Sequence, residues 1–271
     1  MHPRGFRLVC ASCAAFVLLV SSVAGAMDAV LIGNGTYTNN AVWSNLTCSP
    51  NDVTLMDNRL KSTQCNFTNT TYLNQTAPQI ANAVNLGIPT IPNDTWIFYY
   101  TGHGDNTAGF SGGLAGINDN GSGSDLYYPK DFAAQLGGVS HPFFTAVLLD
   151  ACGSGGFAKL ADIFLQAKGI PALFLTATDD SLNCAICGGG GTSNFTFWVN
   201  KGLSGLADGA CGGPANGVVT FDELDCYLTT NYDPLGVKHL YIPRGLGSLG
   251  CRNAVVATRR SSWGEVKQIY R

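Results

Sequence analysis

Two residues whose side chains could perform nucleophilic catalysis, His103 and Cys152, each lie in a polar, glycine-rich segment that directly follows an apolar run. The first segment reads WIFYYTGHGD and the second reads AVLLDACGSGG. A thiol can attack a carbonyl carbon, and an imidazole can move the protons that such a reaction requires. The backbone amides of Gly104 and Cys152 are natural donors to the resulting oxyanion. These residues predict nucleophilic catalysis by a cysteine.

The elements that would position these residues follow from the pattern of apolar side chains. Short continuous apolar runs predict strands that are buried on both faces, over residues 29–32, 95–100, 143–149 and 171–177. Amphipathic spacing predicts helices over residues 52–61, 77–86, 157–166, 194–203 and 221–230. In the third of these helices the apolar stripe is predicted to comprise Leu160, Ile163 and Phe164, and Thr220 with Glu223 predicts a capping box before the last one.

Strands that alternate with helices predict an α/β fold with a mainly parallel sheet flanked by helices. The carboxyl ends of parallel strands meet at one edge of such a sheet, which is where active sites lie in these folds. We therefore expect His103 and Cys152 to lie within hydrogen-bonding range of each other.

The N-terminal residues and the cysteines indicate an oxidising compartment. Residues 1–26 are typical of a cleaved secretory signal, because basic residues precede a short apolar run and Ala24-Gly25-Ala26 ends it. Eight cysteines follow this segment, and most are expected to pair, with a local or other structural pairing of Cys184 and Cys187 favoured over a zinc site. Eight glycosylation sequons support secretion or residence in the secretory or endolysosomal pathway, at Asn34, Asn45, Asn66, Asn69, Asn74, Asn93, Asn120 and Asn194.

Charge divides the chain into an acidic body and a basic tail. Residues 27–237 carry 6 basic and 17 acidic residues, whereas residues 238–271 carry 7 basic residues and one acid. We interpret the first range as the catalytic domain, and the second as the end of that domain or a tail that is trimmed. The net charge of −3 gives no reason to expect a nucleic-acid partner, and no apolar run other than the signal is long enough for stable membrane association.

The two catalytic segments resemble those of the caspase-like cysteine peptidases, and of metacaspases in particular. Residues 100–104 read YTGHG where metacaspases carry Tyr-Ser-Gly-His-Gly, and residues 150–155 read DACGSG where they carry Asp-Ser-Cys-His-Ser-Gly. Similar segments occur in the family's order across residues 28–230, at 29–34, 48–60 (with one extra residue), 193–208 and 217–228. The resemblance implies a three-layer caspase-like domain and a Cys152–His103 dyad that cleaves protein or peptide substrates.

The resemblance also implies a specificity pocket formed by two acids and a small polar residue. These fall on Asp52, Asp150 and Thr101, and two carboxylates would select Arg or Lys immediately before the scissile bond. Many metacaspases bind calcium through an aspartate cluster, which the acids at 119, 125 and 131 do not reproduce, so no metal or cofactor is predicted. The tail would be trimmed at its basic residues or would occupy the acidic pocket as an inhibitor.

Two alternatives compete with the peptidase interpretation. The segment LLDACGSGG also resembles the glycine-rich loop of a nucleotide-binding or methyltransferase fold, but such a loop should follow the first strand of its domain. The second alternative is a secreted binding glycoprotein that uses a caspase-like scaffold and leaves the thiol of Cys152 unused.

Overall fold

The computed structural model describes residues 27–88, 95–105, 112–138, 144–179, 187, 191–243 and 248–252. The predicted signal segment, the sequon at Asn93, Cys184 and residues 253–271 of the basic tail lie outside the described residues.

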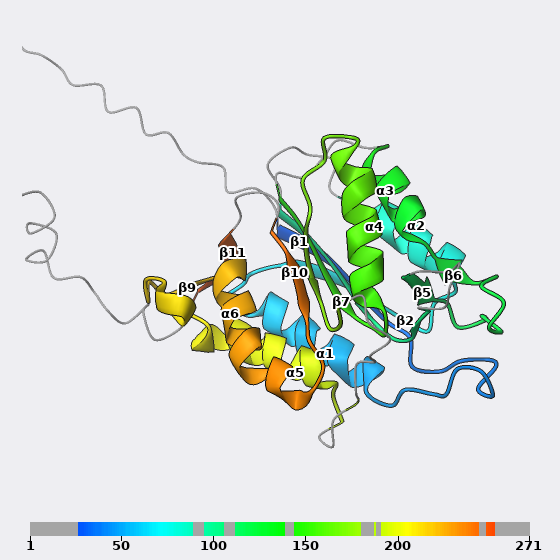
Figure 1. Ribbon diagram of the computed structural model, residues 1–271, viewed down its shortest axis with the longest axis horizontal. Helices are drawn as coiled ribbons and strands as arrows, with labels where there is room; N and C mark the ends of the chain where they lie inside the picture. Colours follow the sequence, from blue (N-terminus) through cyan, green and yellow to red (C-terminus); the bar gives the residue numbers. More distant parts are fainter. Residues whose placement is uncertain are drawn as a thin grey trace, which may run out of the picture.

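A six-stranded sheet forms the centre of the molecule, with strand order β10-β8-β7-β3-β1-β2 (Figure 1). Neighbouring strands from β2 to β8 pair in parallel, and β10 joins the β8 edge in antiparallel orientation. The strands are β1 (Met27–Gly33), β2 (Thr68–Leu73), β3 (Thr95–Thr101), β7 (Phe144–Asp150), β8 (Leu173–Thr176) and β10 (Leu240–Ile242). The four predicted apolar runs are β1, β3, β7 and β8, so their assignment as buried strands is confirmed.

Helices cover both faces of this sheet and give the molecule three layers (Figure 1). One apolar core lies under α1 (Ser49–Lys61), α5 (Asn194–Lys201) and α6 (Phe221–Asn231). The other lies under α2 (Ala77–Gly87), α3 (Pro129–Leu136) and α4 (Ser154–Gln166). The predicted three-layer α/β class is therefore confirmed, although the sequence patterns did not indicate α3.

Within the described residues, two smaller sheets and three single helical turns accompany the central sheet. A three-stranded sheet follows the carboxyl end of β3 and comprises β4 (Gly104–Asp105), β5 (Gly113–Ala115) and β6 (Leu126–Tyr127). A two-stranded sheet pairs β9 (Val218–Thr220) with β11 (Ser248–Arg252). Single helical turns are η1 (Gly202–Leu206), η2 (Ala210–Gly212) and η3 (Asp233–Leu235).

Local expectations for two helices had different outcomes. The capping box is present at the start of α6, where Thr220 and Glu223 bond reciprocally. The apolar stripe predicted for α4 was wrong, because Ile163 and Phe164 are exposed and the helix buries Phe157, Ala161 and Leu165 instead. The buried residues recur at a spacing of four along the helix, so the face toward the sheet is centred on Ala161 and not on Ile163.

All seven cysteines within the described residues are disulfide-bonded. Disulfides join Cys48 to Cys187, Cys65 to Cys251 and Cys211 to Cys226, and Cys152 is disulfide-bonded as well. A local pairing of Cys187 with Cys184 is therefore wrong, because the sulfur of Cys187 bonds to Cys48 across 139 positions. Disulfides at this density are typical of proteins that fold in an oxidising compartment. None of the helices in the described ranges has the length and apolar character needed to cross a membrane.

Candidate active site

The two glycine-rich corners lie side by side at the carboxyl edge of the sheet. Thr101 at the end of β3 pairs with Asp150 at the end of β7, and the Gly102 N–H donates to the Asp150 carbonyl at 3.1 Å. His103 and Cys152 each follow two positions later. A Cβ atom on Gly104 would lie 2.2 Å from the carbonyl oxygen of Cys152, so the two backbones are in direct contact. The parallel register therefore brings the two corners together, and glycine is required for this approach.

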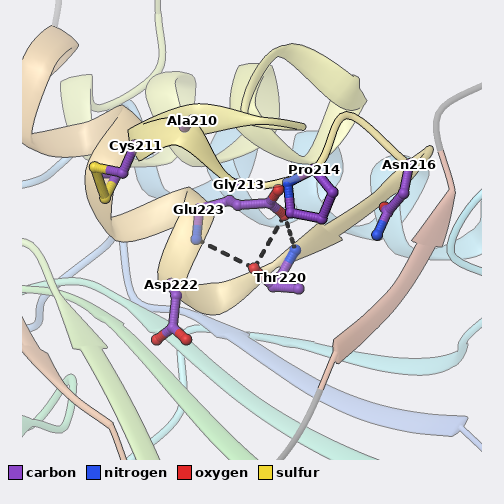
Figure 2. A pocket seen from close by; sticks show the side chains of 9 residues that line it. Ala210, Cys211, Gly213, Pro214, Asn216, Thr220, Asp222 and Glu223 are labelled. Carbon is purple, nitrogen blue, oxygen red and sulfur yellow. Dashed lines mark hydrogen bonds between the residues drawn. A yellow bond between two sulfur atoms is a disulfide. The ribbon is translucent and has the colours of Figure 1, made fainter.

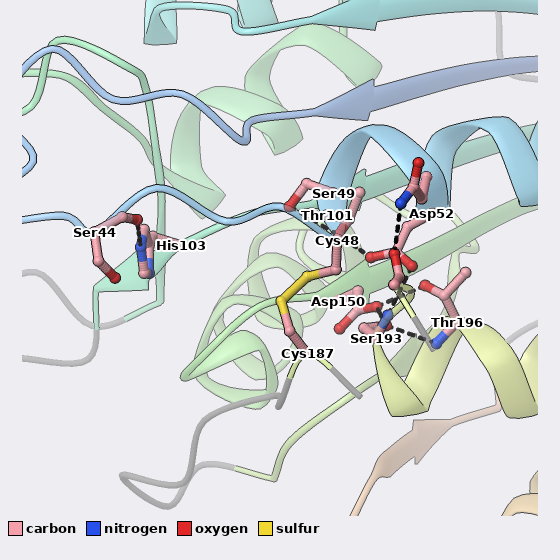
Figure 3. The surroundings of a disulfide bond; sticks show 12 residues. Ser44, Cys48, Ser49, Asp52, Thr101, His103, Asp150, Cys187, Ser193 and Thr196 are labelled. Atoms are coloured by element: carbon pink, nitrogen blue, oxygen red, sulfur yellow. Dashed lines mark hydrogen bonds between the residues drawn. A yellow bond between two sulfur atoms is a disulfide. The ribbon is translucent and has the colours of Figure 1, made fainter. Parts of the chain in front are cut away.

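His103 is held by residues that the sequence patterns did not single out. Its Nε2 lies 2.7 Å from the carbonyl oxygen of Ser44, and its backbone N–H donates to the Tyr37 hydroxyl at 2.8 Å (Figure 3). The rings of Tyr37 and Trp43 lie 4.9 and 5.0 Å from the imidazole centroid. Burial lowers the pKa of His103, and the Ser44 carbonyl opposes this shift only in part. The imidazole is therefore neutral at pH 7, as a group that both accepts and donates protons must be.

Cys152 is half-buried at the start of α4 and is disulfide-bonded. The next residue, Gly153, is the N-cap of α4 and adopts φ = +63°, which glycine tolerates without strain. A cysteine beside a helix N-terminus has a stabilised thiolate once it is reduced. The structure thus describes an oxidised form in which the sulfur of Cys152 is not a nucleophile.

Asp52 and Asp150, the carboxylate pair, lie buried between β3, β7 and the first turn of α1. Thr101 donates its hydroxyl to Asp52 at 3.1 Å, and the Ser193 backbone N–H donates to the same carboxylate at 2.8 Å. Asp150 accepts hydrogen bonds from the hydroxyls of Ser193 and Thr196. The structure therefore brings together the three residues predicted to form the pocket, despite the extra residue near the start of α1.

Two buried carboxyl groups so close together resist ionisation. Burial, and next the negative charge of Asp150, raise the pKa of Asp52 to about 8. Burial also raises the pKa of Asp150, although its hydrogen bonds with Ser193 and Thr196 oppose the shift. The carboxylate pair therefore holds a proton at neutral pH unless a cation approaches.

One oxygen of the pair lacks a protein partner. Oδ1 of Asp150 is buried without a hydrogen bond, and Asp150 lines a small cleft beside the Cys48–Cys187 disulfide (Figure 3). The cleft has a volume of about 20 Å³, which is room for roughly one water molecule. Its lining is Leu46, Cys48, Ser49, Thr101, Gly102, Asp150, Cys187 and Ser193. A lysine or arginine side chain would fit only if the lining moved.

Ser193 joins the carboxylate pair to the helix that follows it. Its hydroxyl bonds to Asp150 and also accepts the backbone N–H of Thr196, as the N-cap of α5. The sequence pattern signals a helix start here, because a serine precedes the predicted helix by one position. Its second role, as a contact to both acids, depends on strand order and could not be derived from local sequence.

Comparison with known proteins agrees with this geometry. A family model described as "Caspase domain" matches residues 27–194. The chain belongs to the caspase-domain family. Among solved structures, the caspase domain is similar to caspase-1 from Spodoptera frugiperda, with a TM-score of 0.56 and 10% identity over 85% of this chain and 92% of that one. A protein from Geobacter sulfurreducens gives a TM-score of 0.56 and 12% identity over 82% and 94% of the two chains. Comparison with curated protein sequences gave no match.

The acids that follow β3 in this caspase domain hold the surrounding loop together. Asp119 accepts the backbone N–H groups of Gly121 and Asp125, and Asp125 accepts those of Ala77 and Asn118. No group of three or more metal-ligating side chains occurs in the ranges that the structure describes.

One predicted glycosylation site is wrong. Asn34 is fully buried, and its amide nitrogen donates to the carbonyls of Gln75 and Ala115 at 2.8 Å each. A glycan on this nitrogen is incompatible with the fold. By contrast, Asn45, Asn66 and Asn120 are exposed, and Asn69, Asn74 and Asn194 are partly exposed.

A larger cavity, about 300 Å³, is lined by residues between Ala210 and Cys226 (Figure 2), and neither glycine-rich corner contributes to it. The Cys211–Cys226 disulfide and Pro214 form part of its wall. Glu223 lines this cavity, but its carboxylate already accepts the backbone N–H groups of Gly209 and Thr220. None of the predicted site residues lines this cavity.

Proposed function

We propose that this chain is a cysteine endopeptidase in which reduced Cys152 is the nucleophile and His103 handles the protons. The observation that carries the proposal is the contact between the two corners, where Gly104 abuts the Cys152 carbonyl at the ends of paired strands. Membership of the caspase-domain family supports the same reaction class.

The contacts of His103 assign a role to each ring nitrogen. Nε2 faces the Ser44 carbonyl, so in the neutral ring Nε2 carries the proton and Nδ1 is left to exchange protons with the reactants. Nδ1 of His103 takes the proton of the Cys152 thiol, the resulting thiolate attacks the peptide carbonyl, and Nδ1 passes this proton to the amine as the C–N bond breaks. His103 then deprotonates a water that attacks the thioester, and the C–S bond breaks to restore the thiolate. The amides of Gly104 and Cys152 are the proposed oxyanion donors.

We further propose that the carboxylate pair selects Arg or Lys immediately before the scissile bond. The unpartnered Oδ1 of Asp150 is an acceptor without a donor, and a cationic group would supply both the donor and the countercharge. The small volume of the cleft means that substrate binding would have to displace its lining, including the segment around Cys187.

The disulfide at Cys152 makes reduction the first step of this proposal. A dithiol reductant would transfer two electrons and two protons to the disulfide, which releases the thiol of Cys152 and leaves the reductant as a disulfide. The same observation favours a second candidate function, a binding scaffold in which Cys152 stays oxidised and serves the fold.

One assay distinguishes the two candidates. Fluorogenic peptides ending in Arg, Lys or Asp would be incubated with the protein, with and without a dithiol reductant. We expect turnover of the Arg and Lys peptides only after reduction, and none by the Cys152→Ala or His103→Ala variants. The exposed Asp131→Asn variant is a matched control for Asp150→Asn, which should lose at least about a hundredfold in kcat/KM for these peptides. Turnover by Cys152→Ala, or none by the reduced wild type, would exclude the peptidase.

We also propose that the protein is a secreted glycoprotein and that its basic tail is trimmed or covers the acidic pocket. Within this tail, Cys251 bonds to Cys65, which precedes the amino end of β2, so the tail is held at that point near the end of the sheet opposite the pocket. Intact-mass measurement of the active wild type and of Cys152→Ala would test self-trimming, and equal masses would reject it.

A further inference from the structure

The segment between β1 and α1 forms a strap, residues 35–46, that crosses the carboxyl edge of the sheet beside His103. Its two ends meet where the Leu46 N–H donates to the Gly35 carbonyl at 2.8 Å. The N–H of Thr38 donates to the Ile117 carbonyl at 2.9 Å, which fixes the strap to the loop after β5. Asn74 accepts the backbone N–H groups of Gly35 and Thr36, and Tyr37 is buried, so the first part of the strap is well anchored. By contrast, most residues from Asn40 to Asn45 are exposed.

Trp43 is the half-buried exception in this exposed stretch. Its indole Nε1–H donates to Oδ2 of Asp119 at 2.9 Å, and Asp119 is itself fully buried. The same carboxylate accepts the backbone N–H groups of Gly121 and Asp125, so the position of Asp119 is fixed. The hydrogen bond from Trp43 to Asp119 is called the tether below. On its other side the indole packs against the imidazole of His103 at 5.0 Å and an interplanar angle of 36°.

We propose that Trp43 is a positioning residue for His103, because its tether to Asp119 fixes the strap and thereby presents the Ser44 carbonyl to the imidazole. The proposal rests on the proposed function for its effect on catalysis, although the placement of the ring can be measured without it. Ser44 directly follows Trp43, so a displacement of the indole also displaces the acceptor of Nε2.

The two contacts of the strap act together on His103. The Ser44 carbonyl fixes which nitrogen carries the proton, and the indole excludes water from one side of the ring. Burial is the largest cause of the lowered pKa of His103. Within the described residues, the titratable side chains that hydrogen-bond to the backbone of His103 are Tyr37 and Tyr100. Burial raises the pKa of both hydroxyls, so both stay neutral in the range where histidine titrates. Asp119 is linked to His103 through Trp43, which bonds to the carboxylate and packs against the imidazole.

Two substitutions separate the tether from the ring contact. Trp43→Phe keeps an aromatic ring but has no N–H for Asp119, and Trp43→Ala loses both contacts. Trp198→Phe is the matched control, because Trp198 is a half-buried tryptophan that packs in the opposite layer, against Tyr227. The pKa of His103 would be measured by NMR titration of its ring protons, assigned with His103→Ala, in the oxidised protein where no catalysis is needed.

We expect Trp43→Ala to raise the pKa of His103 toward its ordinary value of about 6.5, because burial is the larger of the two effects that it removes. Trp43→Phe keeps the ring contact but loosens the Ser44 carbonyl, which raises the pKa, so this variant is expected to lower the pKa of His103 further. In the reduced enzyme we expect kcat for an Arg peptide to fall by about 10–100-fold in Trp43→Ala, with KM changed less than about threefold. Trp198→Phe should move neither quantity.

The outcomes separate the two proposals. An unchanged His103 pKa in both folded Trp43 variants would overturn the positioning role, whether or not the enzyme is active. These pKa shifts in a protein without peptidase activity would support the positioning of His103 and reject the proposed function. Folding of each variant is checked by thermal unfolding, and Trp43→Phe retains the test if Trp43→Ala does not fold.

Discussion

Asp52 and Asp150 face each other in a buried site where their described hydrogen-bond partners are all uncharged. The pKa of Asp52 is raised to about 8, first by burial and second by Asp150, and burial raises that of Asp150. In the proposed function a cationic side chain would bind the ionised pair, so below this pKa it would first have to expel a proton. The affinity for an Arg peptide is therefore expected to increase about tenfold per pH unit between pH 6 and 8.

Calorimetry of an Arg peptide binding to the Cys152→Ala protein checks this pH dependence. Repeating the titration in buffers of different ionisation enthalpy should show release of about one proton at pH 7. Asp131→Asn should retain the effect. Affinity that is flat across this pH range would contradict the shared proton.

The same carboxyl pair has the opposite consequence for the stability of the free protein. A carboxyl whose pKa is higher in the folded state contributes its stability at low pH and loses it as pH rises from about 4 toward 8. At pH 8 the free energy of unfolding of Asp150→Asn should therefore exceed that of the wild type by about 1–2 kcal/mol, which means that the variant is more stable. At pH 4 the two proteins should differ little. Urea unfolding at the two pH values measures this, and an equal loss of stability at both would reject it.

Gly104 leaves no room for a side chain where the two corners meet. A methyl group there would lie 2.2 Å from the Cys152 carbonyl, so Gly104→Ala must separate the two corners. We expect this variant to lose at least about a hundredfold in kcat, since about 1 Å of misplacement has a cost of that order. Gly138→Ala is the matched control, because its added methyl would meet nothing closer than 3.5 Å. Full activity of Gly104→Ala would mean that the contact is not needed.

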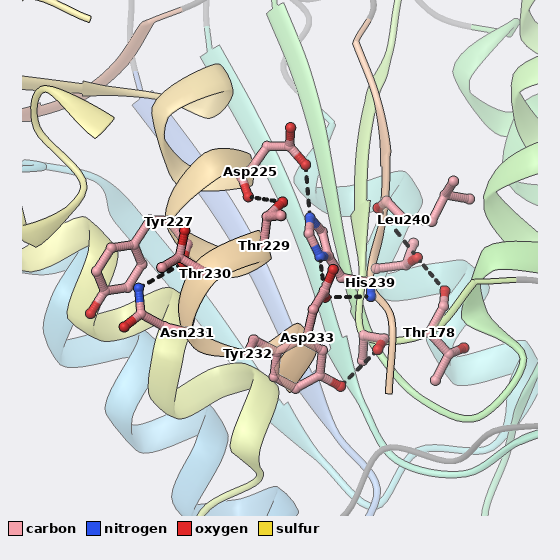
Figure 4. A network of polar contacts seen from close by, with 12 residues as sticks. Thr178, Asp225, Tyr227, Thr229, Thr230, Asn231, Tyr232, Asp233, His239 and Leu240 are labelled. Atoms are coloured by element: carbon pink, nitrogen blue, oxygen red, sulfur yellow. Dashed lines mark hydrogen bonds and ion pairs between the residues drawn. The ribbon is translucent and has the colours of Figure 1, made fainter. Parts of the chain in front are cut away.

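Among the elements, α6, η3 and the edge strand β10 are joined by one buried histidine. Nε2 of His239 lies 2.7 Å from Asp225, and its Nδ1 lies 2.6 Å from Asp233 (Figure 4). Burial alone would lower the pKa of His239, but the hydrogen bonds and charges of the two acids together raise it. Both ring nitrogens face an acceptor, so the imidazolium form is the one that satisfies the site.

The stability that His239 contributes is expected to be lost at alkaline pH. Because its folded pKa is raised, this contribution is complete below pH 6.5 and disappears as pH rises through the raised pKa. His239→Gln places an amide oxygen against one carboxylate and should cost about 1–3 kcal/mol at pH 6. Urea unfolding at pH 6 and pH 9 tests this, with the exposed neighbour Lys238→Gln as control. A cost as large at pH 9 would show that packing, not charge, is responsible.

Elements with long apolar or amphipathic patterns could be predicted from sequence, and the contacts between elements could not. Continuous apolar runs predicted the four central strands, and the parallel order of these strands places His103 and Cys152 at one edge of the sheet. The edge strand β2 is mostly polar and none of its residues is buried, so no apolar run or alternation marked it. Ser193 and Trp43 reach the site through pairings across 43 to 141 positions, which local spacing does not encode.

At the scale of the whole molecule, disulfides connect segments that the sheet leaves apart. Cys48–Cys187 lies beside the carboxylate pair, whereas Cys65–Cys251 ties the end of the described chain to the segment after α1, at the opposite end of the strands. The three disulfides that join described residues close loops of very different length, with their cysteines 139, 186 and 15 positions apart.

Loop closure predicts how much each link stabilises the fold. Cys65–Cys251 spans 186 positions and restricts the unfolded chain by about 5 kcal/mol, against about 3 kcal/mol for Cys211–Cys226, which spans 15. We expect the double variant Cys65→Ala/Cys251→Ala to lower the Tm more than Cys211→Ala/Cys226→Ala does. Differential scanning calorimetry of both oxidised variants and the wild type provides the comparison. An equal or smaller loss for the longer link would show that contacts in the folded state, such as the burial of Cys65 and Cys251, outweigh the constraint on the unfolded chain.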